Sequence, residues 1–118
     1  MTLADIRRLL DCEVIYGDDD LLEQTEVRSC FAADLMSDVL AFSRSGALLV
    51  TGLTSLQSVH TADIADLPAI LFIHDKRPGG PIVDVARHKR IPLLTTRRFM
   101  FETCGLLFDH GLKAAGKE

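Results

Sequence analysis

The sequence predicts an α/β fold: a single three-layer domain with a mostly parallel sheet flanked by helices. The main indication is residues 69–96, AILFIHDKRPGGPIVDVARHKRIPLLTT. Residues 69–73 are continuously apolar, which is typical of a strand buried on both faces in a parallel sheet. Pro81 suits the first residue of a helix, and apolar residues recur after it at helical spacing. A second apolar run follows from Pro92, so the segment predicts strand, helix and strand in succession.

Length and composition are those of one domain. The chain has 118 residues, of which 47% are hydrophobic, so residues 1–118 are expected to fold around one core. No apolar run approaches the roughly 20 residues of a membrane span, and the first residues do not resemble a signal peptide. We therefore expect a cytoplasmic protein without a membrane partner. Cys12, Cys30 and Cys104 are too few and too widely spaced to predict disulfides or a zinc site.

Charge is distributed unevenly along the chain. Residues 1–75 hold 13 acidic and 4 basic residues, a balance of −9, whereas residues 76–118 hold 4 acidic and 9 basic residues, a balance of +5. The overall net charge of −4 argues against nucleic acid as a partner. The basic cluster is compatible with binding of a small anion.

The first third of the chain predicts a helix, a strand and a loop. Thr2 is expected to cap a helix, with Asp5 in the position of a capping-box acid. Residues 13–16 predict a short strand. The three aspartates at 18–20 predict a solvated loop, and without EF-hand spacing they are not expected to bind calcium.

The middle of the chain alternates strands and helices. Residues 27–32 and 47–50 predict strands. Asp34 is expected to cap the helix between them, and a second, more exposed helix is expected over residues 55–65. The predicted apolar positions are Leu35, Met36, Val39 and Leu40 in the first helix and Leu56, Val59 and Ile64 in the second.

Residues 97–112 predict a last helix that is apolar almost all round. Its core face is expected to contain Met100, Cys104, Leu107 and Phe108, while Phe99, Phe101, Leu106 and Leu112 lie elsewhere around it. Such a helix is often buried against another subunit, and Gly105 would permit a close approach of backbones. We therefore expect a homodimer through Phe101, Gly105 and Leu106. The alternative is that the N-terminal helix covers this surface within the same chain.

Three loops are expected to follow buried strands. Ligands of open parallel sheets gather at the carboxyl ends of the strands, where helix N-termini present free N–H groups. The candidate residues for binding a phosphorylated ligand are Thr51, Thr54, Ser55, Lys76, Arg77, Thr95, Thr96 and Arg97. The alternative is local: Thr and Ser also cap helices, and Lys and Arg in loops are usually solvated.

Catalytic signatures are missing from the sequence. It contains no GxxxxGK[ST] loop, no GxGxxG after a strand and no GxSxG elbow. The four histidines, at positions 60, 74, 88 and 110, form no i, i+4 pair that would suggest a metal site. We therefore predict no cofactor, no metal and no catalytic residue, and an enzyme with an unrecognised cysteine or carboxylate site remains an alternative.

Four segments together resemble the DRTGG domain family. They are residues 34–40 (DLMSDVL), 53–57 (LTSLQ), 91–96 (IPLLTT) and 100–105 (MFETCG). Members occur alone at this length, and as accessory modules of phosphotransacetylases and of regulated pyrophosphatases that also carry CBS domains. The resemblance implies a non-catalytic α/β module that dimerises and has a regulatory or scaffolding role.

The sequence departs from the family at the motif that names it. Gln24-Thr25 and Ser29-Cys30 stand where the family has its Asp-Arg and Gly-Gly pairs. The resemblance favours a regulatory module that binds a nucleotide or another phosphorylated anion. The alternative is a protein-interaction module without a small ligand, acting in trans on a metabolic or redox enzyme complex.

Overall fold

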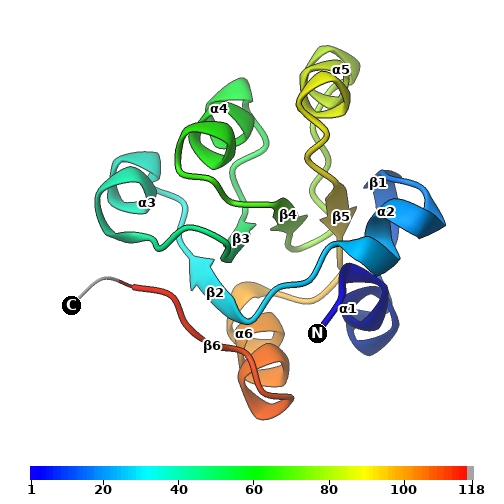
Figure 1. The fold of residues 1–118 in the computed structure, drawn as a ribbon, viewed down its shortest axis with the longest axis vertical. Helices are drawn as coiled ribbons and strands as arrows, with labels where there is room; N and C mark the ends of the chain where they lie inside the picture. Colours follow the sequence, from blue (N-terminus) through cyan, green and yellow to red (C-terminus); the bar gives the residue numbers. More distant parts are fainter. Residues whose placement is uncertain (117–118) are drawn as a thin grey trace.

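Six strands form one sheet in the order β1-β5-β4-β3-β2-β6 in a computed structural model that describes residues 1–116 (Figure 1). The edge strand β1 runs antiparallel to β5, and all other neighbours are parallel. The predicted α/β fold with a mostly parallel sheet is therefore confirmed. The strands are β1 (Glu13–Tyr16), β2 (Ser29–Ala32), β3 (Leu48–Thr51), β4 (Ala69–Phe72), β5 (Leu93–Thr95) and β6 (Lys113–Ala114).

Helices cover both faces of the sheet. In Figure 1, α3, α4 and α5 lie above the sheet, on what we call the three-helix face, and α1 and α6 lie below it, on the two-helix face. Helix α2 packs beside α1 near the β1 edge. The helices are α1 (Leu3–Leu10), α2 (Asp19–Gln24), α3 (Met36–Phe42), α4 (Leu56–Ile64), α5 (Gly80–Lys89) and α6 (Met100–Asp109).

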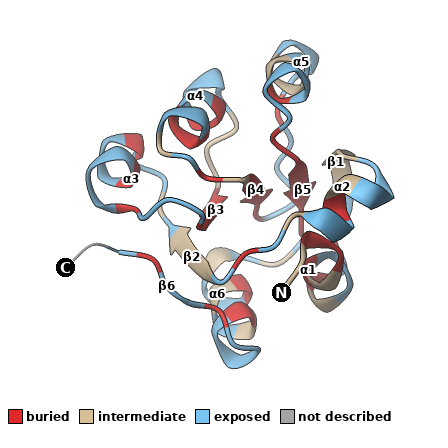
Figure 2. Cartoon of the chain, in the orientation of Figure 1, coloured by how far each residue is buried: buried red, intermediate tan, exposed pale blue. Residues whose placement is uncertain are grey.

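The sheet separates two hydrophobic cores. Strands β3 and β4 are buried along their whole length, as the red ribbon in Figure 2 shows. Their alternate side chains point to opposite faces, so Leu49 and Phe72 belong to the core of the three-helix face and Val50 and Leu71 to that of the two-helix face. No helix among residues 1–116 is long and apolar enough to cross a membrane.

The sequence correctly predicted features that depend on a side chain bonding to nearby backbone. Thr2 caps α1, and the Asp5 carboxylate accepts a hydrogen bond from the Thr2 N–H at 2.9 Å, which completes the predicted capping box. These bonds, with the backbone bond first, lower the pKa of Asp5. The strands predicted in residues 27–32 and 47–50 are β2 and β3, shifted by one or two residues.

Two predictions in the first half of the chain were wrong. Residues 18–20 do not form a loop: Asp18 accepts a hydrogen bond from the Leu21 N–H at 2.8 Å and so begins α2, whose Leu22 enters the core. Asp34 does not cap α3, which begins after Leu35 without a side-chain cap. The two-residue strand β6 carried no signal in the sequence.

The predicted core faces of the helices were partly wrong. Short helices bury a narrow stripe, which in α3 contains Met36 and Val39 but not Leu35 or Leu40. Helix α4 packs through small side chains, Ser58, Val59, Thr61 and Ala62, so Leu56 and Ile64 face outward. In α6, Leu107 is buried, but Phe108 is 74% exposed.

Candidate anion site at the carboxyl ends of the strands

The carboxyl ends of β3, β4 and β5 lie at one edge of the sheet because these three strands are parallel neighbours. The three loops that contain the predicted site residues therefore share this edge. Helix α5 leaves β4 toward the three-helix face, whereas α6 leaves β5 toward the two-helix face (Figure 1). Such a switch of direction between neighbouring strands is where open α/β sheets commonly bind ligands.

The loops after β4 and β5 are hydrogen-bonded to each other at this switch. The backbone N–H groups of His74 and Asp75 donate to the carbonyls of Arg98 and Thr96, each at 2.8 Å. His74 and Asp75 both adopt positive φ, which turns the chain sharply enough to make these bonds. The His74 ring also lies 4.0 Å from the ring of Phe99. These contacts hold the loop after β4 and the loop after β5 together.

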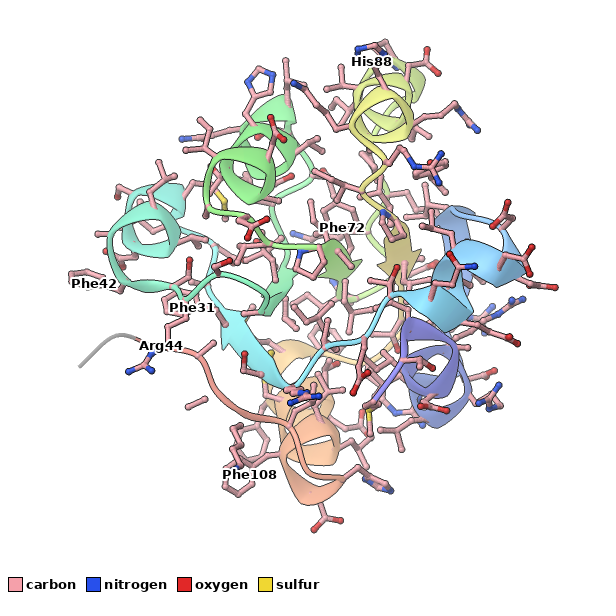
Figure 3. The ribbon with its side chains drawn as sticks, viewed as in Figure 1. Phe31, Phe42, Arg44, Phe72, His88 and Phe108 are labelled. Atoms are coloured by element: carbon pink, nitrogen blue, oxygen red, sulfur yellow. The ribbon has the colours of Figure 1, made fainter. Side chains whose placement is uncertain are left out.

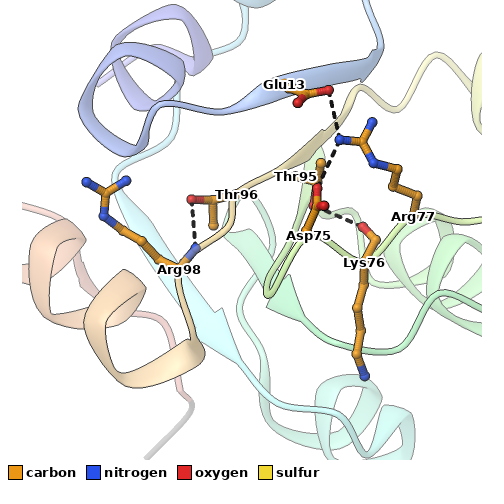
Figure 4. A network of polar contacts seen from close by, with 7 residues as sticks. All are labelled: Glu13, Asp75, Lys76, Arg77, Thr95, Thr96 and Arg98. Atoms are coloured by element: carbon orange, nitrogen blue, oxygen red, sulfur yellow. Dashed lines mark hydrogen bonds and ion pairs between the residues drawn. The ribbon is translucent and has the colours of Figure 1, made fainter.

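The charge of Arg77 is compensated by two carboxylates, one in its own loop and one on β1. Its guanidinium donates to Glu13 at 2.8 Å and to Asp75 at 2.9 Å (Figure 4). The hydrogen bond to Glu13, followed by the bond to Asp75, raises the pKa of Arg77. Because two carboxylates already compensate this charge, an anion would have to displace them to gain a strong contact with Arg77.

The three threonines at strand ends are buried, and their hydroxyls already donate within the protein. Thr51 donates to the Asp34 carboxylate at 3.0 Å, Thr95 to the Lys76 carbonyl at 2.9 Å and Thr96 to the Leu10 carbonyl at 2.9 Å. The Leu10 carbonyl also accepts from Arg98 at 2.7 Å, which attaches the end of α1 to the loop after β5. In this arrangement the threonines stabilise the loops.

Lys76 lies over the loop that follows β3. A Cβ on Gly52 would lie 3.6 Å from the Lys76 ammonium and 3.5 Å from an Asp34 oxygen, so the small residue makes room for both. Asp34 accepts a hydrogen bond from the Gly52 N–H at 2.7 Å. Sequence reasoning missed this role of Asp34, although an acid two positions after the predicted strand 27–32 was the available signal.

Two helices of the three-helix face begin at this edge without a side-chain cap. Ser55 and Gly79 are the N-cap residues of α4 and α5, and neither provides a side-chain cap. Such N-termini favour negative charge. Thr54 is half-buried, and Ser55, Lys76 and Arg97 are exposed. These four residues are therefore the part of the predicted set that an incoming anion can reach most directly.

No family model and no curated protein matches the sequence. A search of solved structures finds the crystal structure of the CBS and DRTGG domains of the regulatory region of Clostridium perfringens pyrophosphatase, complexed with the activator diadenosine tetraphosphate. The TM-score is 0.71 at 14% identity, and the match covers 96% of this chain and 50% of that chain. The similarity shows the fold. At this identity it assigns neither a ligand nor a site residue.

Proposed function

We propose that this protein is a non-catalytic regulatory module that binds a nucleotide or another phosphorylated anion at the carboxyl edge of its sheet. The observation that carries the proposal is that α4 and α5 both begin without a side-chain cap, after the loops that hold Gly52 and the exposed Lys76. Phosphate oxygens accept hydrogen bonds from the N–H groups at a helix N-terminus, and the helix dipole favours their charge. The regulatory region that shares the fold is complexed with a nucleotide activator, which supports the same class of ligand.

The residues proposed to bind the ligand are Thr54, Ser55, Lys76 and Arg97. Thr51, Arg77, Thr95 and Thr96 are proposed to shape the loops, because their donors are already used within the protein. We further propose that residues 1–118 form a DRTGG-like domain, and that it acts as a homodimer through the C-terminal helix.

Ligand binding can be tested by thermal shift with diadenosine tetraphosphate, ATP, AMP and inorganic phosphate. A ligand at 100 times its dissociation constant adds about 2.7 kcal/mol, which raises the melting temperature of a domain of this size by on the order of 10 °C. Lys76→Ala should remove most of that rise. Lys113→Ala is the matched control, because Lys113 is also exposed but pairs with Ser29 at the amino end of β2.

Two results would contradict the ligand proposal. One is the absence of any thermal shift with all four compounds, and the other is an equal loss of binding in Lys76→Ala and Lys113→Ala. The first result would favour the second candidate function, a protein-interaction module without a small ligand that acts in trans on an enzyme complex. The observation in favour of that alternative is the outward-facing aromatic surface of α6, where Phe99, Phe101 and Phe108 are 61%, 92% and 74% exposed.

A further inference from the structure

We infer that two copies of this chain pack their α6 helices antiparallel, with Phe101 of each copy in an apolar pocket beside α6 of the other. The inference rests on the proposed homodimer and specifies its contacts. It starts from two features of one surface, an exposed aromatic stripe on α6 and a pocket next to it. Neither feature is explained by packing within the subunit.

The stripe consists of Phe101, Gly105 and Phe108. These residues are four and three positions apart, so they lie on the same side of the helix. Phe101 is 92% exposed and Phe108 is 74% exposed, and within residues 1–116 a Cβ on Gly105 would meet no atom within 4 Å apart from the backbone of its own helix turn. Figure 3 shows Phe108 projecting outside α6, whereas Phe72 lies inside the protein. Two large rings on either side of a glycine leave a gap into which another helix can fit.

The pocket lies between α6 and the uncovered part of the two-helix face. It has a volume of about 190 Å³, and most of its lining is apolar, from β2 (Cys30, Ala32), α6 (Cys104, Leu107, Phe108) and the segment after α6 (Leu112 to Ala114). Pockets that bind small molecules usually measure about 300 to 1,000 Å³. This one is closer to the size of a single large side chain.

Burial of the two thiols is consistent with the apolar character of the pocket. Desolvation raises the pKa of Cys30 to about 12, and it also raises the pKa of Cys104. Both side chains are therefore neutral thiols near pH 7, which an aromatic ring can cover without desolvating a charge. Lys113 is the charged residue of the lining, and the other lining residues offer an aromatic ring an apolar surface.

An antiparallel pairing centred between Cys104 and Gly105 brings the ring and the pocket together. In that register Phe101 lies opposite Phe108 of the partner subunit, which is at the level of the pocket. Gly105 then lies at the crossing point, where its lack of a side chain allows the backbones to approach. The same contact occurs twice about the two-fold axis, as a closed dimer requires.

Charge favours the antiparallel direction over the parallel one. Arg97 precedes α6 and Asp109 ends it, both are exposed, and neither forms an ion pair within residues 1–116. An antiparallel pair brings Asp109 within about one turn of Arg97 of the partner subunit and aligns the helix dipoles favourably. A parallel pair would place like charges side by side.

The interface is tested by sedimentation velocity of the full chain at micromolar concentration, with Phe101→Glu and Ile64→Glu. Ile64 on α4 is 73% exposed, so Ile64→Glu is a matched control away from α6. We expect a dimer for the wild type and for Ile64→Glu, and a dissociation constant at least about 30-fold higher for Phe101→Glu. An unchanged circular dichroism spectrum and melting curve in dilute Phe101→Glu will show that the subunit still folds.

The register is tested by thiol cross-linking in a Cys104→Ser background. A mixture of Phe101→Cys and Phe108→Cys proteins should cross-link with a short bismaleimide, and each protein alone should cross-link far less. Equal cross-linking of each protein alone would overturn the antiparallel register. A dimer that survives Phe101→Glu would overturn this interface but leave the proposed homodimer standing, whereas a wild-type monomer would overturn both. Binding of diadenosine tetraphosphate is measured separately, so its failure is distinguishable from either result.

Discussion

The two faces of the sheet are covered to different extents, although the same strands form both. Three successive connections, from β2 to β5, each place a helix on the three-helix face, and these helices cover it. Chain connections of one hand always place their helices on the same side when the strands advance in one direction. On the other face α1 and α6 lie over the sheet, α2 contributes Leu22 near the β1 edge, and part of β2 lines a pocket. Topology thus determines which face keeps an apolar surface available to a partner.

The largest expected contrast is between two phenylalanines. Phe72 is fully buried in the core of the three-helix face, whereas Phe108 is 74% exposed beside the two-helix face. Phe72→Ala should lower the free energy of unfolding by about 3–5 kcal/mol, because it removes apolar burial and leaves a cavity. Phe108→Ala should change it by no more than about 0.5 kcal/mol in dilute protein. Urea denaturation measures both, and a loss above about 2 kcal/mol for Phe108→Ala would mean that its ring packs within the subunit.

A second contrast is the response of the two cores to alkaline pH. All three cysteines lie on the two-helix side, and burial raises the pKa of Cys12 and of Cys30 from 9.0 to about 12. Folding therefore favours the neutral thiols. Their contribution to stability is complete below about pH 9 and is lost as the pH rises from about 9 toward 12.

The alkaline effect can be isolated with a double variant, Cys12→Ala with Cys30→Ala. Between pH 7 and pH 10 the wild type should lose about 1 kcal/mol per buried thiol more than this variant. Taking the difference between the two proteins cancels the titration of Tyr and Lys. Equal pH dependence of the two unfolding free energies would show that the thiols are not desolvated as the structure describes.

Sequence reasoning succeeded where the signal was local. The continuous apolar run of β4, Pro81 near the start of α5 and the Thr2 capping box each depend on residues a few positions apart. It failed where the partner was distant. Arg77 pairs with Glu13, 64 positions away, because β1 lies beside β5 at the edge of the sheet, and nothing near Arg77 encodes that neighbour.

The candidate site was likewise predicted in its location but not in its side-chain contacts. The common edge of the three loops follows from the parallel order of strands, which the sequence predicted. The order of the strands does not reveal which hydroxyls are free to bind a ligand. Thr51, Thr95 and Thr96 each donate to an acceptor that is distant in sequence and lies nearby only in the folded chain. The sequence also did not determine which side of α6 faces the core. A helix that is apolar nearly all round has no single apolar stripe that would mark that side.

The smallest expected contrast is between two helix N-termini, one on each face. Thr2 accepts a hydrogen bond from the Asp5 N–H at 3.1 Å, whereas the Ser55 side chain makes no cap to α4. Thr2→Ala should therefore lower the free energy of unfolding by about 1 kcal/mol, and Ser55→Ala should change it by only a few tenths of a kcal/mol. Chemical denaturation without added anions measures both.

The comparison of Thr2 and Ser55 also bears on the proposed ligand. An N-terminus that its own side chain does not cap retains N–H groups that a phosphate can bind, so Ser55→Ala should leave the free protein as stable as before. If Ser55→Ala instead loses about 1 kcal/mol, the hydroxyl caps α4 in solution. A phosphate would then have to displace that cap, and the N-terminus of α5 with Lys76 would remain as the uncapped part of the site.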